Sequence, residues 1–306
     1  MHRPRVAVLV GPTAVGKTGV ALTLARGLGA EIVNADSLQV YRELHIGTAK
    51  PTAAELALVT HHLIDVAAPD EAYDAARYCR EGREVLAALH CRGVPALVVG
   101  GTGLYIKVLL HGLFEQADIP PQNRQRLRGE LEESGLPALF ERLARLDPAT
   151  ASCLHPHDSY RILRALETLE AGQASLTRLH QAHRFQEAPF RTLKLGLTLP
   201  REELYTRIHR RLEAMLEAGW LAEVEGLLRR YPAELKPLKS LGYRHLIAYL
   251  TGRWSWEEAL ELIRRDTRRY AKRQLTWFRA DPEVHWFHPQ DTEAMGDLFG
   301  EFFQHP

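Results

Sequence analysis

The sequence lacks the features that mark several classes of protein. Its 306 residues include three cysteines, Cys79, Cys91 and Cys153, which lie far apart and form no CxxC pair. Neither a zinc site nor a disulfide framework is therefore indicated, and a reducing cytoplasm fits. No stretch approaches the roughly 18 consecutive apolar residues of a membrane span, and the first residues lack the apolar stretch of a signal peptide. We expect no membrane partner.

The chain also lacks a strong overall charge, since its formal net charge is +1. The charges are nevertheless unevenly distributed. Residues 31–74 contain eight acids and two bases, whereas residues 236–280 contain eleven bases and four acids. A basic stretch in a nearly neutral protein suits a polyanionic partner, although a solvated helix face would carry the same pattern.

The order of apolar segments predicts an α/β fold. Apolar runs at 5–10, 31–34, 95–99 and 193–199 read as buried strands, and a last strand is expected at 284–287. Amphipathic segments between them, including 201–228, read as helices. This alternation is typical of a parallel sheet flanked by helices. No convincing strand appears between residues 118 and 183, where the segments 124–134, 137–146 and 158–171 have a helical period. We therefore predict a core domain of residues 1–116 and 190–306, and an all-helical insertion domain of residues 117–189.

A phosphate-binding loop follows the first predicted strand. The segment matches the pattern G-x-x-x-x-G-K-[ST] in full, with Gly11, Pro12, Thr13, Ala14, Val15, Gly16, Lys17 and Thr18. The two glycines allow the backbone to curl so that its N–H groups face phosphate oxygens, and the next helix adds its positive end. Lys17 supplies a cation and Thr18 a hydroxyl group for Mg²⁺, the cofactor that we expect.

Two further segments are predicted to face this loop, because ligands of such sheets bind at the carboxyl ends of the strands. The strand at 95–99 ends in Gly100-Gly101-Thr102-Gly103, where an NTPase usually has an aspartate. Thr102 could offer a hydroxyl group to a phosphate, or the segment could be a plain turn. Asp36 follows the second strand and could bind Mg²⁺ or accept a proton, or could simply cap a turn.

Taken together, several motifs resemble the bacterial tRNA dimethylallyltransferase family over about residues 6–280. The motifs are GPTAVGKT at 11–18, DSLQVY at 36–41, IGTAKP at 46–51, HHLID at 61–65, GGTGLY at 100–105, HPHDSYRILRALE at 155–167, KSLGYR at 239–244 and AKRQLTWFR at 271–279. The resemblance implies a P-loop NTPase-like core with a helical insertion. It also implies transfer of a dimethylallyl group from its diphosphate to the exocyclic amine of the adenosine 3′ of the anticodon.

The resemblance assigns roles to particular residues. It makes Asp36 the catalytic acid–base group, Thr102 the neighbour of the bridging oxygen, and Arg211 a ligand of the diphosphate that the P-loop holds. It also implies that a set of residues contacts the tRNA: Asp36, Ser37, Leu38, Gln39, Thr102, Arg124, Tyr160, Arg161, Ile162, Leu163, Arg164, Lys239, Ser240, Leu241, Gly242, Tyr243 and Arg244. One departure is His45, which precedes IGTAKP where the family commonly has an acid.

Other patterns have two readings or a structural one. Six basic residues of one predicted helix could follow RNA phosphates or pair with surface acids: Arg264, Arg265, Arg268, Arg269, Lys272 and Arg273. The five tryptophans, Trp220, Trp254, Trp256, Trp277 and Trp286, are assigned to the core rather than to base stacking. The alternative functions are an ATP-dependent small-molecule kinase and an RNA-binding module without catalysis. We expect a monomer.

Overall fold

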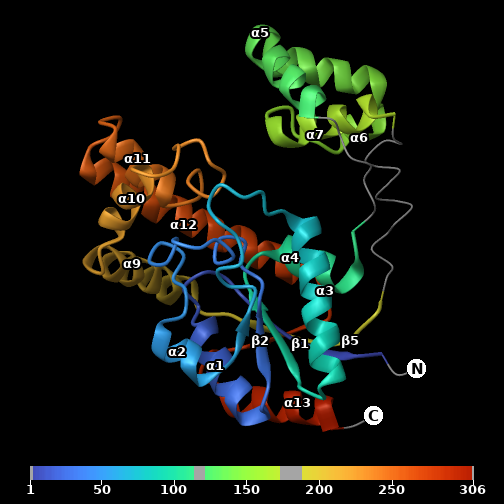
Figure 1. Ribbon diagram of the computed structural model, residues 1–306, viewed down its shortest axis with the longest axis vertical. Coiled ribbons are helices and arrows are strands. Elements are labelled where there is room, and N and C mark those ends of the chain that lie inside the picture. The colour runs from blue at the N-terminus through green and yellow to red at the C-terminus, as the bar shows by residue number, and fades with distance from the viewer. Residues whose placement is uncertain (1–2, 114–120, 173–187, 305–306) are drawn as a thin grey trace. The chain divides into compact units, whose positions relative to one another are not determined.

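The computed structural model describes residues 3–113, 121–172 and 188–304 (Figure 1). The chain forms two compact units, one of Met1–Leu110 with Ala188–Pro306 and one of His111–Glu187. None of the helices in the described ranges is long and apolar enough to cross a membrane.

The first unit is built on a six-stranded parallel sheet in the order β3-β2-β4-β1-β5-β6. The strands are β1 (Arg5–Val10), β2 (Glu31–Asn34), β3 (His61–His62), β4 (Ala96–Gly100), β5 (Arg191–Leu197) and β6 (Val284–Phe287). The central strand β1 begins with the half-buried Arg5, and its five remaining residues are apolar and buried. This burial on both faces is the pattern expected of a parallel strand covered by helices. The predicted α/β sheet is confirmed.

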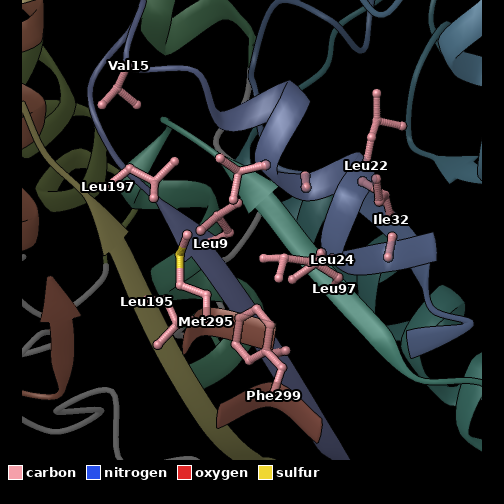
Figure 2. Packing of buried hydrophobic residues seen from close by; sticks show 14 of the residues in the cluster. Leu9, Val15, Leu22, Leu24, Ile32, Leu97, Leu195, Leu197, Met295 and Phe299 are labelled. Atoms are coloured by element: carbon pink, nitrogen blue, oxygen red, sulfur yellow. The ribbon is translucent and has the colours of Figure 1, made fainter. Parts of the chain in front are cut away.

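Two helices far apart in the sequence cover one face of the sheet. These are α1 (Lys17–Leu28) and α13 (Thr292–Gln304), which also contact each other. Figure 2 shows Met295 and Phe299 of α13 beside Leu195, and Leu24 of α1 beside Leu97. All five side chains are nearly or fully buried, and burying one such side chain contributes about 1.5–3 kcal/mol. The apolar face of α1 therefore fixes the helix that follows the P-loop against the sheet.

The other face carries α3 (Ala75–Cys91), which contacts β2 and β4, and α4 (Gly103–His111). A tyrosine cluster joins these helices, because the rings of Tyr78 and Tyr105 stack with centroids 4.1 Å apart. The Tyr73 ring lies 6.5 Å from that of Tyr105, and its hydroxyl group donates to Glu81 at 2.7 Å. The cluster holds α4, and with it the turn that contains Thr102, on the sheet.

The remaining helices of this unit gather beside one another after β5 (Figure 1). They are α9 (Arg201–Glu217), α10 (Trp220–Leu228), α11 (Tyr243–Leu250) and α12 (Trp256–Arg279), while the short α2 (Ala53–Leu58) precedes β3. The continuous helix expected at 201–228 is divided, because Gly219 has a left-handed φ of 94°. The sequence reading also missed β3, which has only two residues, and α13, which lies beyond the last predicted strand.

The second unit is described by α5 (Pro121–Leu146), α6 (Pro148–Ser152) and α7 (Ser159–Glu170). Gly135 interrupts α5 with a φ of 77°, which agrees with the two separate helices predicted there. Its core is a compact apolar cluster of Leu127, Leu139, Leu143, Ala151, Ile162, Ala165 and Leu166. The unit begins at His111, the last residue of α4.

Candidate active site

The P-loop leads from the end of β1 into α1 with the backbone that its glycines require. Gly16 has a φ of 104° and precedes the first residue of α1, Lys17. Gly11 has a φ of 151°, and a Cβ atom there would lie 2.9 Å from the Leu197 carbonyl oxygen of β5. Any side chain at this position would therefore displace the neighbouring strand. The described loop has the form that cradles a phosphate at a helix amino terminus.

The charges of Lys17, Arg211 and Asp36 influence one another beside this loop. Burial, together with the positive charge of Arg211, lowers the pKa of Lys17 to about 7, and the Asp36 carboxylate opposes both effects. Burial also lowers the pKa of Arg211, and Asp36 again opposes the effect. Lys17 Nζ donates to the carbonyl oxygens of Gly11 and Pro12, at 2.9 and 2.8 Å. Arg211, from α9, therefore lies close enough to Lys17 for the two buried cations to repel each other. A bound polyanion would relieve this repulsion.

Asp36 lies in a tight turn at the carboxyl end of β2. Its Oδ1 accepts hydrogen bonds from the N–H groups of Leu38 and Gln39, at 2.9 and 3.4 Å. Asn34 holds the start of this turn, because its Oδ1 accepts from the Asp36 N–H at 3.1 Å and its Nδ2 donates to the Leu63 carbonyl at 3.0 Å. The carboxylate therefore does cap its own turn. In the part of the chain that the structure describes, Oδ2 of Asp36 accepts no hydrogen bond.

Thr102 lies beside Asp36 because the ends of β2 and β4 are hydrogen bonded to each other. The Thr102 N–H donates to the Ala35 carbonyl at 3.1 Å, and the Thr102 Oγ1 accepts from the Ser37 N–H at 3.0 Å. A Cβ atom at Gly100 would lie 2.2 Å from the Ala35 carbonyl oxygen, so only glycine allows this approach. The GGTG segment and the aspartate turn therefore form one rigid edge of the site.

Two residues of α12, which the sequence reading did not assign, complete this edge. Gln274 is only 6% exposed, accepts from the Thr13 N–H at 2.8 Å and donates to the Gly101 carbonyl at 2.9 Å. It thereby joins the P-loop to the threonine turn. Burial and the nearby Asp36 raise the pKa of Tyr270, one helical turn earlier. The sequence signal was the uncharged polar residue Gln274, within the motif AKRQLTWFR and one helical turn after Tyr270.

Two adjoining cavities have these residues as walls. A cavity of about 200 Å³ is lined by Thr13, Ala14, Gly16, Lys17, Thr18, Asp36, Gln39, Thr48, Ala49, Arg211, Tyr270 and Gln274. A smaller one of about 60 Å³ shares Lys17, Thr18, Asp36 and Gln39 with it. A larger cavity, of about 560 Å³, lies around Arg3, Arg5 and Arg191 at the amino ends of the strands and contains none of the predicted site residues.

The donor set of the cavity fits Mg²⁺ held mainly by a phosphate ligand. The described residues contain no group of three or more His, Cys, Asp or Glu side chains that could hold a metal ion. Mg²⁺ bound through substrate phosphates needs fewer protein ligands, because it keeps several waters and takes one or two protein oxygens. The Thr18 hydroxyl group and the Asp36 carboxylate line the same cavity and are suitable donors.

The predicted RNA-contacting segments differ in how much of their surface is available. On α7, Tyr160 is 78% exposed and Arg161 is exposed, whereas Ile162 is buried in the core of the second unit. Leu163 and Arg164 are half-buried, and Arg164 pairs with Glu167 at 3.0 Å. Tyr160 and Arg161 therefore offer the most exposed side chains of this segment for the predicted RNA contact, while Ile162 packs inside. Arg124 is ion paired with Glu167 at 3.3 Å.

The segment at 239–244 is likewise divided. Lys239 and Arg244 are exposed, and Ser240 and Leu241 are half-buried. Gly242 and Tyr243 are buried, and the Tyr243 hydroxyl group donates to Glu223 at 2.6 Å. The Tyr243 side chain, at the start of α11, is buried against Trp220 of α10, so the exposed side chains that this segment offers for the predicted RNA contact are Lys239 and Arg244.

Some of the basic residues of α12 pair with surface acids, and others are exposed and could follow RNA phosphates. Arg265 and Arg269 pair with Asp266, at 3.0 and 3.6 Å, and Arg268 pairs with Glu261 at 3.5 Å. Lys272 and Arg273 are exposed farther along the helix. Trp277 is 45% exposed, which corrects its assignment to the core. A Cβ atom at Gly103 would lie 2.2 Å from the Trp277 Nε1, so the indole lies against the residue after Thr102.

Comparison with known proteins agrees with this geometry. The IPP transferase family matches residues 39–281. The tRNA dimethylallyltransferase of Syntrophobacter fumaroxidans is 53% identical over 291 residues, which cover 95% of this chain and 85% of that protein. The enzyme of the same name from Desulfosudis oleivorans is 52% identical over 285 residues, covering 93% and 91%.

Solved structures show the same similarity over nearly the whole chain. The full-length tRNA isopentenylpyrophosphate transferase of Bacillus halodurans is 34% identical and superposes with a TM-score of 0.74, covering 99% of this chain and 97% of its own. A eukaryotic dimethylallyltransferase acting on tRNA is 27% identical, with a TM-score of 0.78 and coverage of 93% and 74%. The chain belongs to the IPP transferase family.

Proposed function

We propose that this protein transfers the dimethylallyl group of dimethylallyl diphosphate to N6 of the adenosine immediately 3′ of the anticodon of tRNA, with release of diphosphate. One observation carries the proposal: the P-loop and Asp36 line one cavity, and Thr102 is hydrogen bonded to Ser37 in the turn of Asp36, all at the carboxyl ends of β1, β2 and β4. Membership of the family and the names of the relatives support the reaction class. We expect the protein to act as a monomer in the cytoplasm.

The cations of the site match the leaving group. The bond that breaks joins the allylic carbon to the bridging oxygen of the diphosphate, and the bonding electrons leave with the diphosphate. Lys17 and Arg211, together with the N–H groups of the P-loop, are arranged to stabilise this developing negative charge. When bound, Mg²⁺ would neutralise part of the same charge, held by the Thr18 hydroxyl group and the phosphate oxygens.

Asp36 is suited to accept the proton that the adenine amine loses. The amine is a weak nucleophile because its lone pair is delocalised into the ring, so proton removal as the C–N bond forms lowers the barrier. Oδ1 is held by the N–H groups of Leu38 and Gln39, which fixes the carboxylate and directs Oδ2 to this role. For the base to reach Asp36 it must leave the stack of the anticodon loop.

The decisive experiment supplies Mg²⁺, labelled dimethylallyl diphosphate and unmodified tRNA. We expect label in the tRNA, and none when guanosine replaces adenosine at the target position. Hydrolysis of ATP or phosphate transfer without label would instead favour the small-molecule kinase. Binding of tRNA without either reaction would favour a non-catalytic RNA-binding module.

A substitution separates the two roles of Asp36. Asp36→Asn keeps an oxygen that can accept from Leu38 and Gln39, but it removes the base. We expect the rate of transfer to fall by about 10²–10⁴-fold, the usual contribution of a general base. Binding of diphosphate, measured by calorimetry, should persist. A variant with the full transfer rate would exclude Asp36 as the base.

A further inference from the structure

The loop at residues 45–49 forms part of the wall of the 200 Å³ cavity and controls a side chain in it. Thr48 and Ala49 line the cavity. The Gln39 Nε2 donates to the carbonyl oxygens of both residues, at 3.0 and 3.2 Å. Two carbonyl acceptors require the nitrogen of the amide at this place, so the Gln39 Oε1 is left as an acceptor for a ligand. The orientation of Gln39 thus depends on the conformation of the loop.

This loop has an unusual backbone that its own side chains do not explain. Ala49 has a left-handed φ of 47°, a conformation that costs about 1–2 kcal/mol for a residue with a Cβ atom. The N–H groups of His45, Ile46 and Gly47 point to one side, and successive N–H groups arranged in this way attract an anion. Position 45 is a histidine, so the loop carries no carboxylate at its start.

The anion for these groups comes from α10. Glu223 Oε2 accepts from the N–H groups of His45 and Ile46, at 2.9 and 2.7 Å, and its Oε1 accepts from that of Gly47 at 3.2 Å. Oε1 also accepts from the Tyr243 hydroxyl group at 2.6 Å. Four hydrogen bonds to one carboxylate form a charge-assisted cluster that is stronger than the same number of neutral bonds.

Close packing fixes the loop on the helices at the same place. A Cβ atom at Gly47 would lie 2.1 Å from the Trp220 Nε1 and 2.7 Å from the Tyr243 Cε2, and one at Gly242 would lie 2.2 Å from the Trp220 Cη2. Trp220 and Tyr243 are both buried. The loop therefore cannot shift without displacing the aromatic side chains that separate α10 from α11.

We propose that Glu223 is a positioning residue of the transfer reaction. By binding the three N–H groups it holds the loop at 45–49, which orients Gln39 beside Asp36 for the acceptor base. Through Tyr243 the same carboxylate connects the site to the segment at 239–244, whose Lys239 and Arg244 are exposed. The inference rests on the proposed function for its effect on catalysis, but the role of Glu223 in holding the loop does not.

The first test is the substitution Glu223→Gln, which preserves size but brings an NH₂ group against backbone donors. We expect kcat for tRNA to fall about 10–100-fold through misplacement of Gln39, while KM for dimethylallyl diphosphate changes less than about threefold. Glu225→Gln on the same helix is the matched control and should keep the activity of the unsubstituted protein. Unchanged kcat in Glu223→Gln would overturn the proposal.

A second substitution distinguishes positioning from loss of folding. Adding His45→Asp to Glu223→Gln returns a carboxylate to the loop, where it can accept from the N–H group two residues later. We expect this double variant to recover at least about a third of the lost kcat, because only the anion at the loop has been restored. The positioning role would be contradicted if the activity of Glu223→Gln fell only in proportion to its folded fraction and His45→Asp did not restore it.

Hydrogen exchange gives a readout that does not depend on catalysis. In Glu223→Gln the amides of His45, Ile46 and Gly47 should exchange about tenfold faster or more, while those of β1 keep their protection. If the unsubstituted protein transferred no label to tRNA, the proposed function would fail, yet this exchange would still report on the loop. Unaltered exchange at the three amides would refute the proposal even in an active enzyme.

Discussion

Replacing Gln274 by Met should damage both the stability and the activity of the protein, because the amide joins two parts of the site. Met has nearly the same volume and packs in the same space, but it neither accepts from the Thr13 N–H nor donates to the Gly101 carbonyl. Each of these hydrogen bonds contributes about 0.5–1.5 kcal/mol net to the free energy of unfolding.

The two backbone groups that lose their partner, the Thr13 N–H and the Gly101 carbonyl, differ in their access to water. Gly101 is buried, so its carbonyl oxygen would lose a partner at an added cost of about 1–3 kcal/mol, whereas Thr13 is half-buried and its N–H group can be hydrated. We therefore expect the free energy of unfolding to fall by about 2–4 kcal/mol, measured by urea denaturation at equilibrium. The loosened P-loop should also lower kcat/KM for dimethylallyl diphosphate about 10–100-fold.

A matched variant tests which hydrogen bond carries the effect. Gln274→Glu keeps an acceptor for the Thr13 N–H but places a carboxylate oxygen against the Gly101 carbonyl. It should therefore be at least as destabilised as Gln274→Met, since a buried negative charge would face the negative end of the Gly101 carbonyl dipole. The reasoning fails if Gln274→Met unfolds within about 0.5 kcal/mol of the unsubstituted protein and keeps its kcat/KM, a difference typical of a neutral surface change.

Three further outcomes follow from the same structure. Because Lys17 has a pKa of about 7 and binds anions only when protonated, the affinity for diphosphate should weaken as the pH rises above about 7. Calorimetry should show that Lys17→Met loses this pH dependence. Arg211→Gln should shift it to higher pH, because the charge of Arg211 lowers the pKa of Lys17. Lys194→Met should lower the free energy of unfolding by about 1–3 kcal/mol in urea denaturation, less than a fully buried ion pair, because Asp281 and Glu283 can be rehydrated. Trp277→Ala should weaken tRNA binding in a filter assay by about 1–3 kcal/mol if its exposed indole stacks on a base, and an unchanged affinity would return Trp277 to a packing role.

The sequence by itself determined the local elements that repeat a short-range pattern. Three strands have the predicted bounds: Arg5–Val10, Glu31–Asn34 and Val284–Phe287. Short runs rich in apolar and β-branched residues favour a buried strand wherever they occur in a chain. The P-loop was equally readable, since its glycines and lysine act within eight consecutive residues. The kink at Gly135 was visible for the same reason.

Tertiary structure decided the parts that depend on contacts distant in sequence. No periodic pattern identifies Gln274 as the partner of Thr13, or Glu223 as the partner of His45, because the residues of each pair lie 261 and 178 positions apart. Nor could the sequence show that Tyr243 is buried and Trp277 exposed, since both are aromatic residues of amphipathic helices. Which face of a helix is covered depends on the neighbours that the whole fold brings to it, and these determine how the site is held in place.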